Sequence, residues 1–430
     1  PGPCMGRCNV APTVCVGKNY VDVANFDKVK KTIDEKTFDP FIPDYINLSS
    51  YKKNGGYEIA NKIKNGVISK KQVLDSLNES GLKGKGGAGF PTGKKWEIVS
   101  NYNGKKYVAV NGDEGEPGTF KDRSYLESDP HRFLEGALIA SYFINAQKVY
   151  IYMRDEYPTV IKILLDEINK MEDEKIIPKD FFVVRRGAGA YICGEESAMI
   201  ESIEGKRGLP RHRPPYVAEI GLFGCPTLTN NLETLFWVRD IIEKGAKWFA
   251  EKGSNGNKGF HSFSVSGRVK NPGVKVAPAG ITIQQLIDKY CDGMADGHTF
   301  KGYLPGGASG GILPATMNDI PLDYGSKELM DAGCFLGSAA VVVLSDHDNM
   351  KDVALNLLKF FEEESCGQCT PCRSGTEKTV KLMQEKNWNK EKLKDLSEVM
   401  AQASICGLGQ AATNPLNSVL KYFSNEITYE

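Results

Sequence analysis

Three cysteines in a CxxCxxC run, Cys366, Cys369 and Cys372, and a fourth at Cys406 have the residue type and spacing of an iron-sulfur site. Thiolates are the usual ligands of such clusters, and a run of this kind can place three sulfur atoms on one face of a four-iron cube while a distant cysteine supplies the fourth. A structural zinc ion is the alternative, although zinc sites more often use two separated CxxC pairs. The quartet therefore favours electron transfer, with a zinc-containing non-catalytic scaffold as the competing hypothesis.

A glycine-rich run, GKGGAGFPTGKKW at 84–96, could bring backbone amides close to a phosphate group. Lys94 and Lys95 would add positive charge to such an anion cradle. The run is not the phosphate loop of nucleotide triphosphatases. That motif needs a glycine at position 88 and a serine or threonine at position 95, where this sequence has Ala88 and Lys95. A flexible surface loop is the alternative. An anion-binding role for the run is therefore supported only together with the motifs that follow it.

Two further glycine loops carry acidic and amide side chains just after predicted strands. The first, NGDEGEPGTFKDR at 111–123, offers acceptors that suit ribose or ribityl hydroxyls. The second, GAGAYICGEES at 187–197, contains paired glutamates that could bind ribose and, by repelling a 2′-phosphate, favour NAD over NADP. A solvated acidic turn and a helix-start charge pattern are the respective alternatives. Cys193, flanked by apolar residues, is expected to pack in the core.

Strand-like and helical runs alternate through the middle of the chain, which predicts an α/β domain with parallel strands over 58–257. The strand-like runs lie at 107–110, 149–153 and 181–186. The glycine loops would then lie at the carboxyl ends of strands, where such sheets bind ligands. The pattern changes over 258–345, where alternating residues and a helix at 283–290 predict a small β-grasp insert. A glycine run at 306–311 within it is interpreted as a mobile loop and assigned no chemistry.

The last segment, 346–430, is predicted to form a four-helix bundle whose end could bring the cysteine quartet together. Its first helix would follow a capping pattern of Ser345 and Asp348, and its last would begin near Asn414 and Pro415. The two helices between them would start near Thr376 and Lys390. The first segment, 1–57, has no clean period and is treated as a partial domain with a linker.

Composition argues against two classes of partner. The 430 residues include 54 basic and 54 acidic side chains, so the chain has no net positive charge to attract nucleic acid or an anionic membrane surface. The longest apolar run, 339–344, is far shorter than the roughly 20 residues that span a bilayer, so direct membrane insertion is not expected. Eleven cysteines in partly metal-like spacing, without a signal segment at the start, indicate a reducing compartment and hence the cytoplasm.

Five motifs together resemble the family of NADH-binding flavoprotein (51 kDa-type) subunits of respiratory NADH:quinone oxidoreductase and their soluble relatives. They are the runs at 84–96 and 111–123, GAGAYICGEE at 187–196, PTLTNNLET at 226–234 and ESCGQCTPC at 364–372. The resemblance implies a Rossmann-like FMN and NAD domain, a ubiquitin-like insert and a helical bundle with one 4Fe-4S cluster. It also implies that hydride passes directly between NAD and FMN, without a catalytic acid or base from the protein.

The resemblance also implies roles for individual residues. The FMN ligands would be Gly84, Gly86, Lys95, Asn111, Asp113, Gly194, Glu195, Asn230, Asn231 and Thr234. The residues facing NAD would be Phe90, Glu114, Glu116, Glu196 and Tyr216, the last of which stands where relatives carry phenylalanine. The cluster ligands would be Cys366, Cys369, Cys372 and Cys406. Nicotinamide exchanges hydride and iron-sulfur clusters exchange single electrons, so a flavin must stand between them.

Within the family, the run at 404–415 looks like soluble formate dehydrogenases and hydrogenases. It favours the beta (diaphorase) subunit of an NAD-dependent molybdenum formate dehydrogenase; the equivalent subunit of an NAD-linked or bifurcating hydrogenase, or of the respiratory enzyme, is the alternative. The implied partners are NAD(H), a thioredoxin-like two-iron gamma subunit and a large catalytic subunit. The opening CMGRCNVAP resembles half of a thioredoxin-like two-iron domain, in which only Cys4 and Cys8 fit. A remnant without a 2Fe-2S cluster is preferred to a domain whose upstream half is missing.

Overall fold

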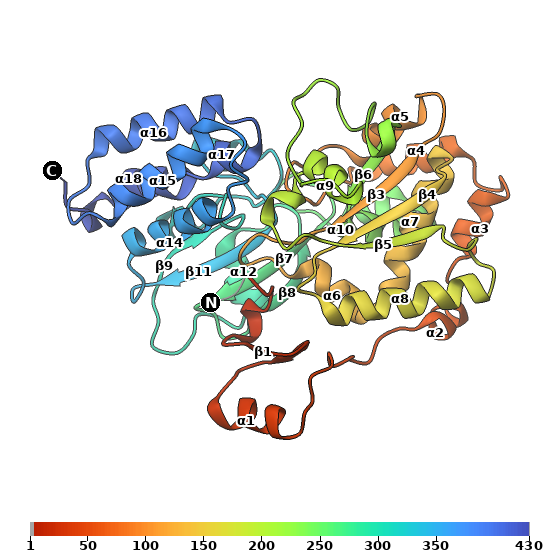
Figure 1. Ribbon diagram of the computed structural model, residues 1–430, viewed down its shortest axis with the longest axis horizontal. Coiled ribbons are helices and arrows are strands. Elements are labelled where there is room, and N and C mark those ends of the chain that lie inside the picture. The colour runs from red at the N-terminus through yellow and green to blue at the C-terminus, as the bar shows by residue number, and fades with distance from the viewer. Residues whose placement is uncertain (1–3, 430) are drawn as a thin grey trace.

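The computed structural model describes residues 4–429, in which two large sheets and a helical C-terminal region follow a small N-terminal strand pair along the chain (Figure 1). Residues 1–3 of the predicted N-terminal segment, and Glu430, lie outside the described residues. The N-terminal segment contains a short antiparallel pair and one helix before the chain reaches the main body. Its elements are η1 (Cys8–Val10), β1 (Val14–Val16), β2 (Asn19–Val21) and α1 (Phe26–Asp34).

The first sheet confirms the parallel α/β core. Its strands, in the order β5-β4-β3-β6 among the described residues, all run parallel. They are β3 (Tyr107–Gly112), β4 (Lys148–Met153), β5 (Phe182–Arg186) and β6 (Thr227–Asn231). Sequence patterning missed β6, whose TLTNN carries more polar than apolar residues. The surrounding helices are α2 (Leu48–Lys53), α3 (Glu58–Lys64), α4 (Lys70–Ser80), α5 (Thr92–Ser100), α6 (Lys121–Ser128), α7 (Pro130–Ile144), α8 (Pro158–Asp173), α9 (Glu196–Ile203), α10 (Leu232–Lys244) and α11 (Ala246–Ala250).

The two faces of this sheet pack against different layers, because successive strand residues point to opposite sides. Val108 and Val110 of β3 belong to the hydrophobic core formed with α7 and α10. Ala109, between them, belongs to a second core that includes α9 and the C-terminal helices. Central strand β3 is therefore buried on both faces, which leaves the loops at its carboxyl end as the accessible part of this strand.

The second sheet has the order β10-β9-β11-β7-β8 among the described residues. It contains β7 (Phe260–Gly267), β8 (Gly273–Pro278), β9 (Phe300–Leu304), β10 (Leu313–Pro314) and β11 (Ala340–Ser345). A hairpin joins β7 and β8, and β11 runs parallel to β7. Helix α12 (Ile283–Tyr290) has the predicted bounds, because Thr282 and Gln285 form a capping box at its start. A short helix, α13 (Lys327–Asp331), precedes β11.

The C-terminal region contains the four predicted helices and, within 4–429, one short addition. They are α14 (Met350–Glu363), α15 (Thr370–Gln384), α16 (Lys390–Ala403), the short α17 (Gly407–Ala411) and α18 (Asn414–Tyr422). The predicted cap at Ser345 is wrong, because Ser345 still belongs to β11 and Asn349 accepts the hydrogen bond from Asp352 N instead. No helix of the described residues is long and apolar enough to cross a bilayer.

Candidate functional site

A cavity of about 560 Å³ opens at the carboxyl end of the parallel sheet, within the size range of small-molecule sites. It lies where the three glycine loops, the loop before β10 and the start of α17 meet. The predicted ligands that line it are Gly86, Asn111, Asp113, Glu114, Glu116, Gly194, Glu195 and Asn231. The fold thus brings together residues that lie up to 145 positions apart in the printed sequence.

Other predicted ligands lie behind or beside this lining and hold the loops that form it. Thr234 Oγ1 accepts a hydrogen bond from Lys85 N at 2.9 Å, and Asn230 Oδ1 accepts one from Trp96 Nε1 at 2.9 Å. Lys95 Nζ donates to Thr229 Oγ1 at 2.9 Å. The remaining predicted ligands outside the lining are Gly84, Phe90, Glu196 and Tyr216, of which Phe90 and Tyr216 are exposed.

The glycine-rich run approaches β6 so closely that a side chain at position 86 would crowd Asn231. A Cβ atom at Gly86 would lie 3.1 Å from Cβ of Asn231. Asn231 itself is fixed, because its amide donates to Asp122 Oδ2 at 2.7 Å and its oxygen accepts from Glu233 N at 3.0 Å. The close approach fits a cradle for a flat or phosphorylated ligand, where a backbone must come near the bound group.

Lys85 is a pocket residue that the sequence interpretation did not single out, although it stands inside the glycine run. Its Nζ donates to Phe260 O at 2.6 Å and to Nδ1 of His261 at 2.8 Å. His261 Nε2 donates in turn to Asp323 Oδ1 at 2.6 Å. Burial lowers the pKa of Lys85 to about 8 and that of His261 to about 4, so His261 is neutral and can accept from Lys85. This chain of bonds fastens the cradle to the second sheet.

The acidic loop presents one carboxylate without a partner and two that are already held. Asp113 Oδ2 is buried and has no hydrogen-bond partner among the described residues. Glu114 accepts from Asp122 N at 2.8 Å, Arg123 N at 3.3 Å and Tyr157 Oη at 3.0 Å. Because an unpaired buried acceptor is costly, Asp113 is the group best placed to take donors from a ligand.

Ser309 of the glycine run at 306–311 lines the cavity, which corrects the interpretation of this run as a mobile loop without a part in the site. Residues 306–311 are buried, and Ser309 N donates to Glu116 Oε1 at 2.9 Å. A Cβ at Gly307, whose φ is +80°, would come within 2.8 Å of Glu116 Cδ. Glu116 is thus positioned by a loop 193 residues away, a contact that no local pattern could indicate.

The paired glutamates lie at the start of α9, and Glu195 also borders the cavity. Glu195 caps α9, where its carboxylate accepts from Ser197 N at 2.9 Å and Ala198 N at 3.0 Å. Arg213 pairs with Glu195 and lies 3.3 Å from Glu196. Burial would raise the pKa of Glu196, but Lys95, Thr229 and Arg213 outweigh it and lower that pKa below its usual value. Glu195 therefore satisfies the helix start and still borders the cavity.

The four cysteines gather at the end of the helical region nearest the cavity. Cys366 lies in the loop after α14, Cys369 caps α15, Cys372 lies in its first turn and Cys406 caps α17. Burial, together with the three neighbouring thiols, raises the pKa of Cys372 to about 11, against a hydrogen bond from Ser365. All four thiols are free, as ligands of a cluster must be before it is inserted.

Helix α17 connects the quartet to the cavity. It starts at the cap residue Cys406, and Gly407, Leu408 and Gln410 line the cavity. The cysteine site and the cavity therefore share one turn of backbone. A redox group in the cavity and a cluster on the cysteines would be close neighbours, as single-electron transfer requires.

Comparisons with known proteins match both halves of this site. Residues 77–240 match the Nuo51 FMN-binding domain, and residues 352–430 match the NADH-ubiquinone oxidoreductase-F iron-sulfur binding region. An NADH-quinone oxidoreductase F subunit of Rhizobium meliloti is 40% identical over 400 residues, covering 90% of this chain and 94% of the relative. The F subunit of Aquifex aeolicus is 39% identical over 400 residues, covering 89% and 91%.

Solved structures of an NAD⁺-reducing [NiFe]-hydrogenase have the same fold. The H₂-reduced form matches with a TM-score of 0.86 at 30% identity, over 99% of this chain and 76% of that one. The air-oxidized form matches with a TM-score of 0.87 at 29% identity, over 100% and 78%.

The fold and the site define a protein of the NADH dehydrogenase type, with an FMN-binding domain, a 4Fe-4S region and NADH as substrate. The chain belongs to the family of NADH-quinone oxidoreductase F subunits. The unpaired oxygen of Asp113, the close approach at Gly86 and the free thiols fit these cofactors. The matched iron-sulfur region also decides between a cluster and a structural zinc ion in favour of the cluster.

The acidic loop makes a pH dependence of stability testable. Burial raises the pKa of Asp113 and of Glu114 to about 7, above the usual values near 4 of an unfolded chain. The folded protein therefore holds protons that the unfolded chain releases, and stability falls as the pH rises from about 4 to about 7. The free energy of unfolding of the FMN-free wild type should therefore fall between pH 5 and 7. We expect this fall to be about 2 kcal/mol smaller in Asp113→Asn.

Urea unfolding of FMN-free protein at several pH values measures this effect. Asp395→Asn, at an exposed position on α16, is the matched control. Its free energy of unfolding should change with pH as that of the wild type does. A slope for Asp113→Asn equal to that of the wild type would contradict the assignment.

Proposed function

We propose that this chain interconverts NADH hydride with single electrons as the diaphorase subunit of a soluble NAD-dependent formate dehydrogenase. The observation that carries the proposal is the cavity that reaches from the acidic glycine loops to the first turn of α17, next to Cys406. Bound FMN would supply the chemistry that links two-electron and one-electron transfer. The protein's own task is to position the two ring systems, keep water out and hold the cluster within reach.

The proposed residue roles come from the family resemblance, and the positions of several of these residues support them. Asn111, Asp113 and Asn231 line the cavity with amide and carboxylate groups that suit FMN, and Gly86 lets the backbone approach it. Lys95, Asn230 and Thr234 support this cradle from behind, through the bonds described above. Glu114, Glu116, Glu196, Phe90 and Tyr216 are assigned to the NAD side.

The finer features of the fold belong to the same proposal. The hairpin of β7 and β8, helix α12 and the parallel pairing of β11 with β7 support a β-grasp insert over 258–345. The loops at the carboxyl end of the parallel sheet support a Rossmann-like domain over 58–257. The helices after Asn349 support a bundle over 346–430.

A second candidate is the equivalent subunit of an NAD-reducing hydrogenase. The match over nearly the whole chain to such an enzyme, with TM-scores of 0.86 and 0.87, favours it. The run at 404–415 supports both candidates, and the respiratory relatives make a quinone-linked complex the third. The proposed partners are a two-iron gamma subunit and a large catalytic subunit, whose chemistry would differ among these enzymes.

Isolation of the natural assembly from its source tests the proposal. A large subunit with molybdenum and formate-dependent NAD⁺ reduction would support the formate assignment. Nickel together with H₂-dependent NAD⁺ reduction would replace it with the hydrogenase. An assembly without FMN, or one that fails to oxidise NADH with any acceptor, would overturn the diaphorase function itself.

Alanine substitutions at two glycines of the glycine-rich run should affect FMN affinity differently. We expect Gly86→Ala to weaken FMN binding by about tenfold or more, because the new Cβ meets Asn231 at 3.1 Å in the cavity wall. Gly84→Ala, whose Cβ would meet its nearest atom at an ordinary 3.5 Å and which lies outside the lining, should bind FMN as the wild type does. Titration of flavin fluorescence with FMN-free protein measures both affinities, and equal losses in the two variants would count against this cradle geometry.

A further inference from the structure

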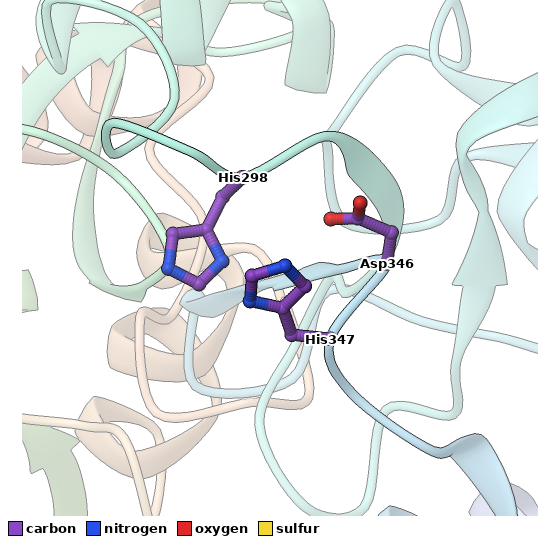
Figure 2. A group of neighbouring side chains, drawn as sticks. All are labelled: His298, Asp346 and His347. Atoms are coloured by element: carbon purple, nitrogen blue, oxygen red, sulfur yellow. The ribbon is translucent and has the colours of Figure 1, made fainter.

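Two histidines and an aspartate converge at one end of the second sheet, away from the cavity and the cysteines. His298 precedes β9, and Asp346 and His347 follow β11 (Figure 2). One ligand atom from each of the three lies within 4.8 Å of the others. We propose that His298, Asp346 and His347 bind a divalent transition-metal ion, with zinc as the best fit.

The ends of β9 and β11 hold the three residues together. The two strands pair antiparallel up to Ser345 and Phe300. Beyond that pair, Asp346 N donates to Thr299 O at 3.0 Å, and Thr299 N donates to Asp346 Oδ1 at 2.8 Å. The backbone on both sides of the site is thus fixed before any ion binds, which reduces the entropic cost of binding.

Ser345 also orients the His298 ring and holds the backbone of His347. Ser345 Oγ lies 2.9 Å from His298 Nδ1 and accepts from His347 N at 3.2 Å. The ring centroids of His298 and His347 lie 4.6 Å apart at an angle of 56°, so the rings are neighbours without being stacked. A hydrogen bond to one ring nitrogen helps to orient the ring, so that its other nitrogen can bind a metal ion.

The charges around the site favour a cation. Asp346 supplies the one carboxylate of the site, beside the imidazole rings of His298 and His347. The nearby cations are already paired, since Arg268 binds Asp348 at 2.8 Å and Lys301 lies 2.9 Å from Glu426. A bound divalent ion would therefore meet one carboxylate and two imidazole groups, while the neighbouring cations are held by other acidic side chains.

The ligand set selects the class of metal. Imidazole nitrogens suit zinc, copper, nickel and cobalt, whereas calcium and magnesium prefer oxygen ligands alone. Three protein ligands leave one position of a tetrahedral zinc ion for water. His347 also borders a cavity of about 520 Å³ between β11 and α14, whose walls include Cys8 and Val353. Asp346 and His347 lie in the turn between β11 and α14, so a bound ion would hold this turn against His298.

Equilibrium dialysis of the FMN- and cluster-loaded protein against zinc chloride tests the site. Free thiols are first blocked by alkylation, so that cysteines do not take up zinc. We expect the wild type to bind one more zinc ion per chain than the His298→Ala/His347→Ala variant at micromolar free zinc. His212→Ala, which removes another exposed histidine, is the matched control and should bind as the wild type does. Equal zinc content in all three proteins, or no zinc on the wild type, would overturn the proposal.

Location of the ion provides a second readout that does not depend on any variant. Crystals of the wild type soaked in zinc should give an anomalous difference peak between His298, Asp346 and His347. A zinc peak elsewhere, with none at these side chains, would overturn the proposal even if the double variant failed to fold. NADH oxidation should be unchanged in a folded His298→Ala/His347→Ala protein, because neither residue borders the FMN cavity.

Discussion

Cys406→Ser is expected to leave the reduction of bound FMN by NADH at the wild-type rate, while onward delivery of single electrons falls by at least about 100-fold. Cys406 is the proposed cluster ligand that lies next to the cavity, because it caps α17, whose first residues line the cavity. Serine is a good helix cap, so the start of α17 should survive the substitution. The variant thus removes a cluster ligand with little disturbance of the flavin pocket.

Stopped-flow loss of flavin absorbance measures the first step in this variant, and reduction of a one-electron partner protein measures the second. The electron paramagnetic resonance signal of the reduced cluster should disappear in parallel with the second step. Cys15→Ser, at an exposed thiol outside the site, should behave as the wild type does in both steps. Unchanged onward transfer in Cys406→Ser would show that the quartet does not carry the electrons.

Glu195→Gln is expected to raise kcat/KM for NADPH by at least about tenfold, which corresponds to about 1.4 kcal/mol. The family resemblance assigns Glu195 to FMN, but the paired glutamates are also candidates for repelling a 2′-phosphate, and of the two it is Glu195 that borders the cavity. Its carboxylate pairs with Arg213. Its replacement removes a negative charge that would repel a 2′-phosphate, and it frees Arg213 to bind one. The glutamine oxygen can still accept from Ser197 N and Ala198 N, so the cap of α9 should persist.

Steady-state kinetics with NADH and NADPH and an artificial acceptor measure this change in specificity. Glu201→Gln is the matched control, because Glu201 pairs with Arg211 from the same helix but does not border the cavity. A ratio of NADPH to NADH activity that stays the same in Glu195→Gln would mean that another residue sets the preference.

Local patterns predicted those parts of the fold that are stabilised locally. Helix α12 was placed at its observed bounds because its capping box and apolar spacing lie within ten residues. The cysteine quartet and the glycine loops were recognisable because each motif is short and its chemistry needs particular residue types. The same motifs supported the family, which the comparisons then established.

The errors arose where tertiary contacts decide the structure. Strand β6 is polar in sequence, yet pairing with β3 makes it a strand, and its Asn231 borders the cavity. The cap of α14 was placed four residues too early, because β11 extends through Ser345. The glycine-rich sequence at 306–311 is typical of a mobile loop, but in the structure Ser309 of this loop contacts Glu116 at the site. Such long-range contacts leave no periodic pattern in the sequence.

An anaerobic titration with NADH of the FMN- and cluster-loaded protein tests the central claim most directly. Flavin absorbance and the paramagnetic signal of the reduced cluster are followed in the same samples. The account predicts that NADH bleaches one FMN per chain and that the cluster signal grows in the wild type but not in Cys406→Ser. A protein that retains no FMN, or whose flavin is reduced while its cluster accepts no electron from any two-electron donor, would contradict it.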